Sequence, residues 1–151
     1  MTDSKTPTIK NLARLSYAKI VQKEMPGGFD FSNDTKAKIP HLAFLRIKNA
    51  VLGKKYELSV AIVGTSKMRE LNRRWRDKDM PTDILSFPLS EAEGEIYISP
   101  AEAKKESEKF NRPCDNFILF LLIHGLVHLK GYEHGSRMES IEKKFRKKFG
   151  I

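Results

Sequence analysis

One stretch of the chain is apolar on every side of a helix, and this feature restricts the fold more than any other. The residues from Phe117 to Val127 are almost all apolar, within a helix predicted over Asp115–Lys130. The uninterrupted apolar run, Phe117–Ile123, is far shorter than the roughly 18 to 20 residues that cross a membrane. The sequence therefore predicts a central helix that other elements bury, in a protein that does not enter a membrane.

The other periodic segments predict short helices and strands in alternation. Helices are predicted at His41–Leu52, Ser66–Arg76, from a Ser99 cap towards Phe110, and at Arg137–Phe149, with a weak one over Ile9–Ile20; strands are predicted at Tyr56–Ile62, Ile84–Leu89 and Glu95–Ile98, with a short extended piece in Met25–Phe31. The last two strands form a hairpin around the polar SEAEG, and Ser99, Pro100 and Glu102 form a capping box. We expect an α+β (mixed α/β) fold: a small central sheet of about four strands packed with helices, with the central apolar helix carrying a zinc motif.

Length and composition restrict the class of protein. The 151 residues have the length of one domain, predicted over 1–151, although residues 1–40 carry no clear pattern. The formal charge of +9, from 28 Lys and Arg against 19 Asp and Glu, favours anionic partners such as nucleic acid. The apolar content of 40% excludes a disordered basic tail. A single cysteine, Cys114, and a polar start unlike a signal peptide indicate a reducing, cytoplasmic location.

The histidines carry the chemistry. Three of the four fall in HGLVHLKGYEH, as His124, His128 and His134. Positions i and i+4 share one face of a helix, so the first two imidazoles can reach one ion. The helix should end at Gly131, because glycine takes the left-handed cap conformation and lets the chain bring His134 back. The spacing therefore predicts a metal site of three imidazoles.

A single histidine on an apolar helix is usually a hydrogen-bonded core residue. Two imidazoles buried together without an ion would need partners that their apolar neighbours cannot offer. Three nitrogen ligands without a thiolate favour zinc, one ion per chain, while iron, nickel and copper stay open. A fourth position left to water would make such a site catalytic.

The spacing also matches the zinc motif of the metzincin peptidases, H-E-x-x-H-x-x-G-x-x-H, with one departure. Gly125 stands where that motif has its glutamate. In those peptidases the carboxylate is the general base for the zinc-bound water. The ligand set is therefore present without the proton acceptor that cleaves peptides.

Two longer blocks carry a resemblance to a known family. HGLVHLKGYEH is one block, and LNRRWRDKDMPTDILSFP, Leu71–Pro88, is the other. They are similar to H-G-x-x-H-L-x-G-Y-D-H and L-N-x-x-Y-R-x-K-D-x-P-T-D-V-L-S-F-P, the motifs of the YbeY endoribonucleases, metal-dependent bacterial enzymes of ribosomal RNA maturation. With GEIYIS, Gly94–Ser99, the resemblance covers about residues 56–150, and the first 50 residues show no matching motif.

The resemblance implies a zinc-dependent endoribonuclease that cuts single-stranded RNA, in maturation of the 3′ end of small-subunit 16S ribosomal RNA and in ribosome quality control. The implied partners are single-stranded RNA, ribosomal RNA and the small ribosomal subunit with its associated factors, and no DNA is expected. It places His124, His128 and His134 on the metal ligands and Arg76 on a functionally important arginine, whose planar guanidinium suits phosphate. Glu133 replaces the family's aspartate, which leaves the role of that carboxylate open.

Three hypotheses follow from the sequence. The leading one is the zinc-dependent endoribonuclease. The second is another metal-dependent hydrolase, such as a peptidase whose base lies elsewhere, and Gly125 counts against it. The third is a zinc-stabilised RNA- or ribosome-binding factor without turnover. For Arg76 itself, the alternative is a solvated surface arginine.

Overall fold

The computed structural model describes residues 28–151, which alternate helices and short strands. The elements are β1 (Phe29–Asn33), the 3-10 turn η2 (His41–Ala43), α2 (Phe44–Leu52), β2 (Glu57–Ile62), α3 (Thr65–Arg76), β3 (Ile84–Ser90), β4 (Glu93–Ile98), α4 (Pro100–Lys109), α5 (Cys114–Leu129) and α6 (Ser136–Phe149). The predicted α+β class is confirmed, and every predicted helix after residue 40 is present. The weak helix predicted over Ile9–Ile20 lies outside the described residues.

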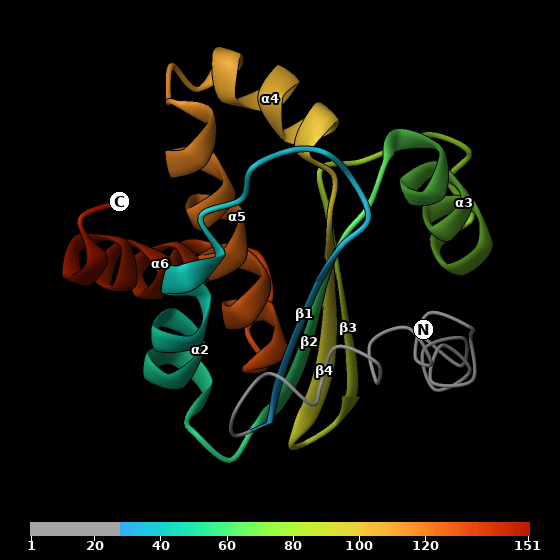
Figure 1. Ribbon diagram of the computed structural model, residues 1–151. Coiled ribbons are helices and arrows are strands. Elements are labelled where there is room, and N and C mark those ends of the chain that lie inside the picture. The colour runs from blue at the N-terminus through green and yellow to red at the C-terminus, as the bar shows by residue number, and fades with distance from the viewer. Residues whose placement is uncertain (1–27) are drawn as a thin grey trace.

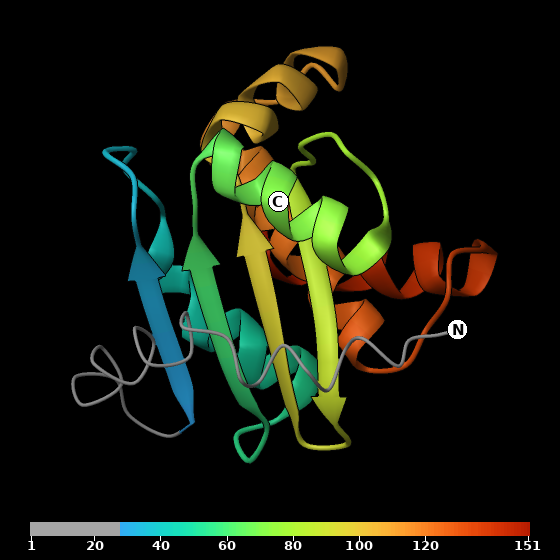
Figure 2. The ribbon, with the colours of Figure 1, turned by 90° about the vertical axis from the view of Figure 1, so that its right-hand side faces the viewer.

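The four strands form one sheet in the order β1-β2-β4-β3. β1, β2 and β4 run parallel, and β3 pairs antiparallel with β4 as the predicted hairpin. Helices α2, α5 and α6 lie on one side of this sheet and α3 lies on the other, as Figures 1 and 2 show from two directions. The sheet therefore stands between a thick helical layer and a single helix.

The alternation of side chains along each strand separates two apolar clusters. On the α5 side, the sheet contributes six side chains with 1% exposure or less: Phe29, Leu58, Val60, Ile62, Ile96 and Ile98. On the α3 side, a smaller cluster joins α3 to the sheet: Val63, Met68, Leu71, Trp75, Leu85, Phe87 and Tyr97. The larger cluster continues through α2, α5 and α6, so most of the core lies on the α5 side.

Helix α5 is the buried central helix that the apolar pattern predicts. It buries nine of its residues, among them Leu122, Ile123 and Leu126. A Cβ atom at Gly125 would lie 2.7 Å from Ser86 Oγ and 3.0 Å from Ile96 Cδ1. Glycine at this position therefore lets the helix lie directly against β3 and β4.

Several local predictions are only partly right. β1 continues two residues past the predicted extended piece and pairs with β2, 29 positions further on in the register. The strands of the hairpin take in most of the segment predicted as its loop. In the predicted capping box, Ser99 Oγ accepts from the Glu102 N–H at 3.4 Å, but the Ser99 N–H donates to the Asp83 carbonyl. The reciprocal bond from Glu102 is absent among the described contacts, because the Ser99 N–H already has that partner.

Within residues 28–151, no helix has both the length and the apolar composition needed to cross a membrane.

Candidate metal centre and its cleft

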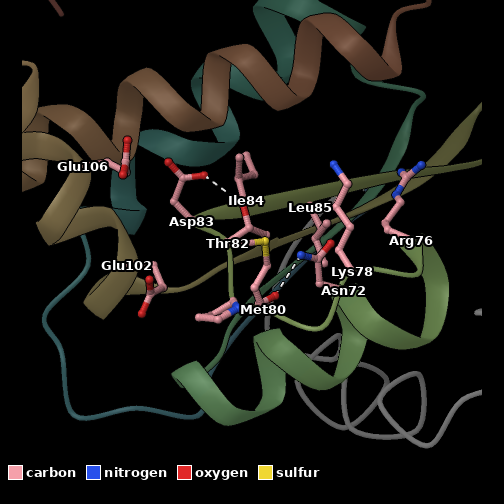
Figure 3. Close-up of a pocket in the computed structure, with 11 residues that line it drawn as sticks. Asn72, Arg76, Lys78, Met80, Thr82, Asp83, Ile84, Leu85, Glu102 and Glu106 are labelled. Carbon is pink, nitrogen blue, oxygen red and sulfur yellow. Dashed lines mark hydrogen bonds between the residues drawn. The ribbon is translucent and has the colours of Figure 1, made fainter.

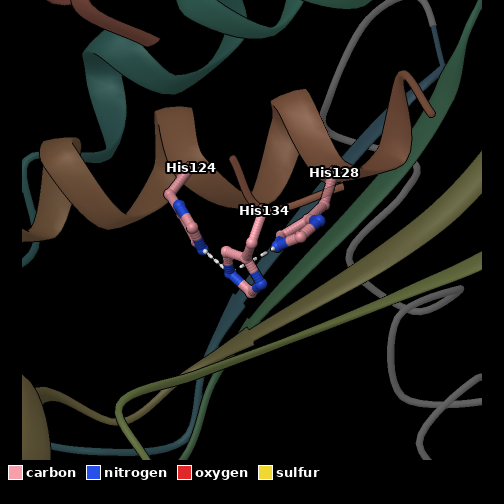
Figure 4. A group of neighbouring side chains, drawn as sticks. All are labelled: His124, His128 and His134. Atoms are coloured by element: carbon pink, nitrogen blue, oxygen red, sulfur yellow. Dashed lines mark hydrogen bonds between the residues drawn. The ribbon is translucent and has the colours of Figure 1, made fainter. Parts of the chain in front are cut away.

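The three predicted histidines meet at the end of α5 (Figure 4). His124 and His128 project from the helix, and α5 ends at Leu129. Gly131 follows with a φ of 111°, so the chain reverses where the sequence predicts. His134 returns from the loop, and its Nε2 lies 3.2 Å from His128 Nε2 and 3.4 Å from His124 Nε2. The ring edges of all three imidazoles therefore point to one place.

The Nδ1 atoms of the two helical histidines each contact an oxygen atom of the protein. His124 Nδ1 lies 3.0 Å from Glu142 Oε2, and His128 Nδ1 lies 3.0 Å from the Tyr132 carbonyl oxygen. A carboxylate and a carbonyl only accept, so in the neutral form of each ring Nδ1 carries the proton and Nε2 presents a lone pair. Such contacts orient metal-binding imidazoles in many proteins.

Glu142 was not singled out from the sequence, although a signal was present. Its side chain is 4% exposed, and it lies one helical turn after Met138, on the buried stripe of α6. A carboxylate on the apolar side of a helix is costly unless it has a partner. Arg146 Nη1, at 3.5 Å, and His124 supply that partner.

The arrangement fits a cation better than it fits hydrogen bonding alone. His134 Nε2 can carry one proton at most, so it can donate to one of the two facing lone pairs. The other lone pair then meets no donor among the described residues. Candidate ligand atoms of the three histidines lie within 4.8 Å of one another, and these residues could bind one metal ion.

Burial favours the neutral, metal-binding form of His128. The pKa of its imidazole is lowered below 6.5, first because burial disfavours the charged form and then because of the neighbouring His124. The hydrogen bond to the Tyr132 carbonyl opposes this shift. At neutral pH the His128 ring is therefore uncharged.

Arg76 lines the same cavity as the three histidines. It is the last residue of α3, and the cavity of about 580 Å³ lies between it, β3 and the end of α5. Its Nη2 donates to the Ser86 carbonyl at 3.0 Å, and its guanidinium carbon lies 4.9 Å from the centre of the Phe87 ring. The predicted arginine is thus exposed, but β3 holds its side chain in place.

A second cavity, of about 620 Å³, adjoins the first and shares Arg76 with it (Figure 3). Lys78 lies near Arg76 at one end, and Asp83, Glu102 and Glu106 lie at the other. The pKa of Asp83 is raised above 3.8, mainly by burial and then by the charge of Glu106. The two cavities together form a cleft whose middle is cationic and whose far end is acidic.

Comparison with known proteins adds the family. The model of the family Endoribonuclease YbeY matches residues 29–150. The chain belongs to the YbeY family. The match begins at residue 29, well before residue 56, where the resemblance seen in the sequence begins.

Individual relatives support the same membership. The Endoribonuclease YbeY of Sulfurihydrogenibium is 34% identical over 130 residues, covering 82% of this chain and 76% of that protein. The one from Persephonella marina is 43% identical over 86 residues, covering 52% of this chain and 56% of its own. A solution structure of the Thermotoga maritima protein TM1509 has a TM-score of 0.62 at 27% identity, covering 81% of this chain and 89% of that one.

The YbeY relatives are matched over part of their length. The chain spans between 56% and 63% of the curated proteins from Persephonella, Thermotoga and Aquifex. The histidine block, Arg76 and the hairpin all lie inside the residues that the YbeY family model matches.

Proposed function

We propose that this chain is a zinc-dependent endoribonuclease that cuts single-stranded RNA. Its proposed role is maturation of the 3′ end of small-subunit 16S ribosomal RNA and ribosome quality control in the cytoplasm, with the small ribosomal subunit and its associated factors as partners. His124, His128 and His134 are the proposed ligands of one zinc ion per chain. The observation that carries the proposal is that three imidazole edges and the Arg76 guanidinium line one cavity.

The donor set suits the proposed chemistry. A zinc ion held by three imidazoles lowers the pKa of a water molecule to about 7 and stabilises charge on a phosphodiester oxygen. His124 and His128 are kept in the required tautomer by Glu142 and the Tyr132 carbonyl. Arg76 is the proposed phosphate-binding group, because a planar guanidinium matches phosphate oxygens and β3 holds it in position.

Peptide cleavage by a metzincin-like site is the alternative that the packing disfavours. A glutamate at position 125 would begin with a Cβ 2.7 Å from Ser86 Oγ, in the contact between α5 and the sheet. The general base of those peptidases therefore fits at its usual place only if the side chains of Ser86, Ile84 and Ile96 move. Among the described residues that line the histidine cavity, the one carboxylate belongs to Glu133, which lies on the exposed loop after α5.

The test measures metal content and RNA cleavage on one preparation. We expect about one zinc per chain by mass spectrometry, and cleavage of single-stranded RNA that His128→Ala abolishes together with the zinc. His41→Ala is the matched control, because His41 lies on η2 and its Nδ1 contacts the Ile39 carbonyl instead. Zinc retained in His128→Ala would show that the ligands are wrong. Zinc without cleavage would favour the ribosome-binding factor.

RNA binding by the same preparation should depend on salt. Each phosphate that the protein neutralises contributes roughly −0.7 to the slope of log affinity against log salt for a single strand. The net charge of +9 leads us to expect a steep slope. A flat dependence would contradict an RNA substrate.

A further inference from the structure

A stack of aromatic rings lies at the junction of α4 and α5, away from the histidines. The ring centres of Phe110 and Phe117 are 5.5 Å apart, those of Phe117 and Phe120 are 5.3 Å apart, and both pairs are stacked. Phe117 is buried, whereas Phe110 is 56% exposed, one of three large apolar side chains in residues 28–151 that are this open to solvent. The stack therefore ends in an aromatic ring that faces water.

Guanidinium groups flank the stack. The Arg112 guanidinium carbon lies 4.6 Å from the centre of the Phe120 ring, and that of Arg146 lies 5.0 Å from it. Arg146 is 11% exposed and ion-paired with Glu139 and Glu142, so its role is to hold Phe120 in place. Arg112 donates a hydrogen bond to Asn116, which is neutral and does not compensate the positive charge of the guanidinium. We call Phe110, Phe117, Phe120 and Arg112 the aromatic platform.

Two residues of the aromatic platform, Phe117 and Phe120, lie on the same helix as His124 and His128. Phe120 lies four residues before His124, one helical turn away on the same face. Helix α6 crosses both: Glu142 holds His124, and Arg146, one turn later, covers Phe120. Along the axis of α5, His124 is about 6 Å from Phe120 and about 10 Å from Phe117. A strand that reaches both sites passes beside α6.

Aromatic rings beside a guanidinium form a surface that suits single-stranded RNA. Unpaired bases stack on exposed aromatic side chains, while the positive charge attracts the phosphates between them. We propose that the aromatic platform binds an unpaired nucleotide of the substrate, with its base stacked on Phe110 and a phosphate near Arg112. This inference rests on the proposed RNA substrate and adds a second point of attachment outside the cleft.

The nearby charges favour RNA over an apolar protein partner. The later turns of α6 carry four exposed cations: Lys143, Lys144, Lys147 and Lys148. Leu42 offers a contrast, because it is 87% exposed but has no aromatic or cationic partner in the described contacts. Phe110 differs from it in stacking on Phe117, beside the Arg112 guanidinium that lies over Phe120, and this combination matches a nucleotide.

The test is equilibrium binding of nuclease-resistant 2′-O-methyl RNA of 12 nucleotides, measured by fluorescence anisotropy on the metal-loaded protein. Phe110→Ala should weaken binding about fivefold or more, the effect of losing one stacked base. Arg112→Gln should reduce the salt slope by about 0.7. Leu42→Ala and Arg46→Gln are the controls and should bind as wild type. Leu42 is exposed like Phe110, and Arg46 lies over the ring of Phe149, but neither residue belongs to the aromatic platform.

Abasic RNA distinguishes stacking from a general loss of affinity. In wild type, removing the base at one position should weaken binding, and in Phe110→Ala that same removal should have no further effect. Wild-type affinity in Phe110→Ala would overturn the proposal and leave the platform to a protein partner. Equal losses at every position would also overturn it.

If the wild type neither cleaves nor binds RNA, the proposed function itself fails. If the wild type cleaves and binds RNA while Phe110→Ala binds it equally well, only this inference fails.

Discussion

The two walls of the cleft are built differently. The histidine wall consists of His124 and His128 on α5 and His134 on the following loop, and it rests on the larger apolar cluster. The arginine wall consists of Arg76 at the exposed end of α3, on the smaller cluster. In the histidine wall, two imidazoles have a second partner at Nδ1. In the arginine wall, a single side chain is held by contacts that include the Ser86 carbonyl and the Phe87 ring.

This difference indicates that the two walls can be altered separately. Changes in the histidine wall disturb the core and the proposed ion together, because the helix that carries the ligands is also the centre of the fold. Changes at the arginine wall reach the cleft without reaching the main cluster. The predictions below test that separation, from the largest expected effect to the smallest.

The largest effect is expected from Gly125→Glu, which forces a carboxylate between α5 and the sheet. Its Cβ alone would lie 2.7 Å from Ser86 Oγ. Overpacking together with an unpaired buried charge should lower the free energy of unfolding by about 3 kcal/mol or more, measured by urea denaturation. Gly64→Glu is the matched control, because a Cβ there meets nothing within 4 Å. A folded Gly125→Glu of normal stability would show that this wall is not tied to the core.

Arg76→Glu should leave zinc content unchanged and reduce single-turnover cleavage at saturating RNA about a hundredfold to a thousandfold. The lost bond to Ser86 and the lost contact with Phe87 should cost only about 1 kcal/mol of stability. Arg74→Glu serves as the control, since it lies two residues earlier and contacts the Trp75 ring. Cleavage within a few fold of wild type would return Arg76 to the role of a surface arginine.

A smaller effect is expected from Glu142→Gln, which keeps the shape but weakens the hold on His124. Loss of such a contact typically lowers metal affinity about tenfold to a hundredfold, which competition with a chelator can measure. Glu139→Gln is matched to it, because Glu139 also pairs with Arg146 but is 67% exposed and does not contact a histidine. Equal affinity in the two variants would contradict the proposed role of Glu142.

The smallest effect concerns the acidic end of the cleft. The pKa of Asp83 is raised by burial and by Glu106, so between pH 3.8 and that raised pKa the Asp83 carboxyl binds more protons in the folded protein than in the unfolded chain. The contribution of Asp83 to stability should therefore fall as the pH rises through this interval. Glu106→Gln should lower the pKa of Asp83, as a carboxyl NMR titration can show, whereas Glu108→Gln, at an exposed position of α4, should not. An unchanged titration in Glu106→Gln would exclude the coupling.

Much of the fold could be predicted because its signals are local. The apolar run of α5, the alternation of β2 and the stop at Gly131 each depend on neighbours within a few residues, and the structure confirms them. The pairing of β1 with β2 was not predicted, because it joins distant segments and no short pattern specifies a partner. The single domain over 1–151 stays a prediction.

The candidate site divides in the same way. The histidines were predicted from their spacing, and the structure brings them together. Glu142 and the Ser86 carbonyl were missed, because each acts across a contact between elements that sequence periodicity does not describe. Arg76 is expected from the family resemblance alone, and its place in the same cavity as the histidines follows only from the structure.

The loop that carries His134 sets one ligand apart from the other two. Gly131 and Gly135, with φ of 111° and 152°, lie on either side of it, while His124 and His128 stand on a buried helix. Two hinges that tolerate such backbone angles allow the third imidazole to withdraw while the first two stay in place. We therefore expect substitution of these two glycines to change the residence time of an ion more than it changes the equilibrium occupancy of the site. His134 should be the first ligand to leave and the last to arrive.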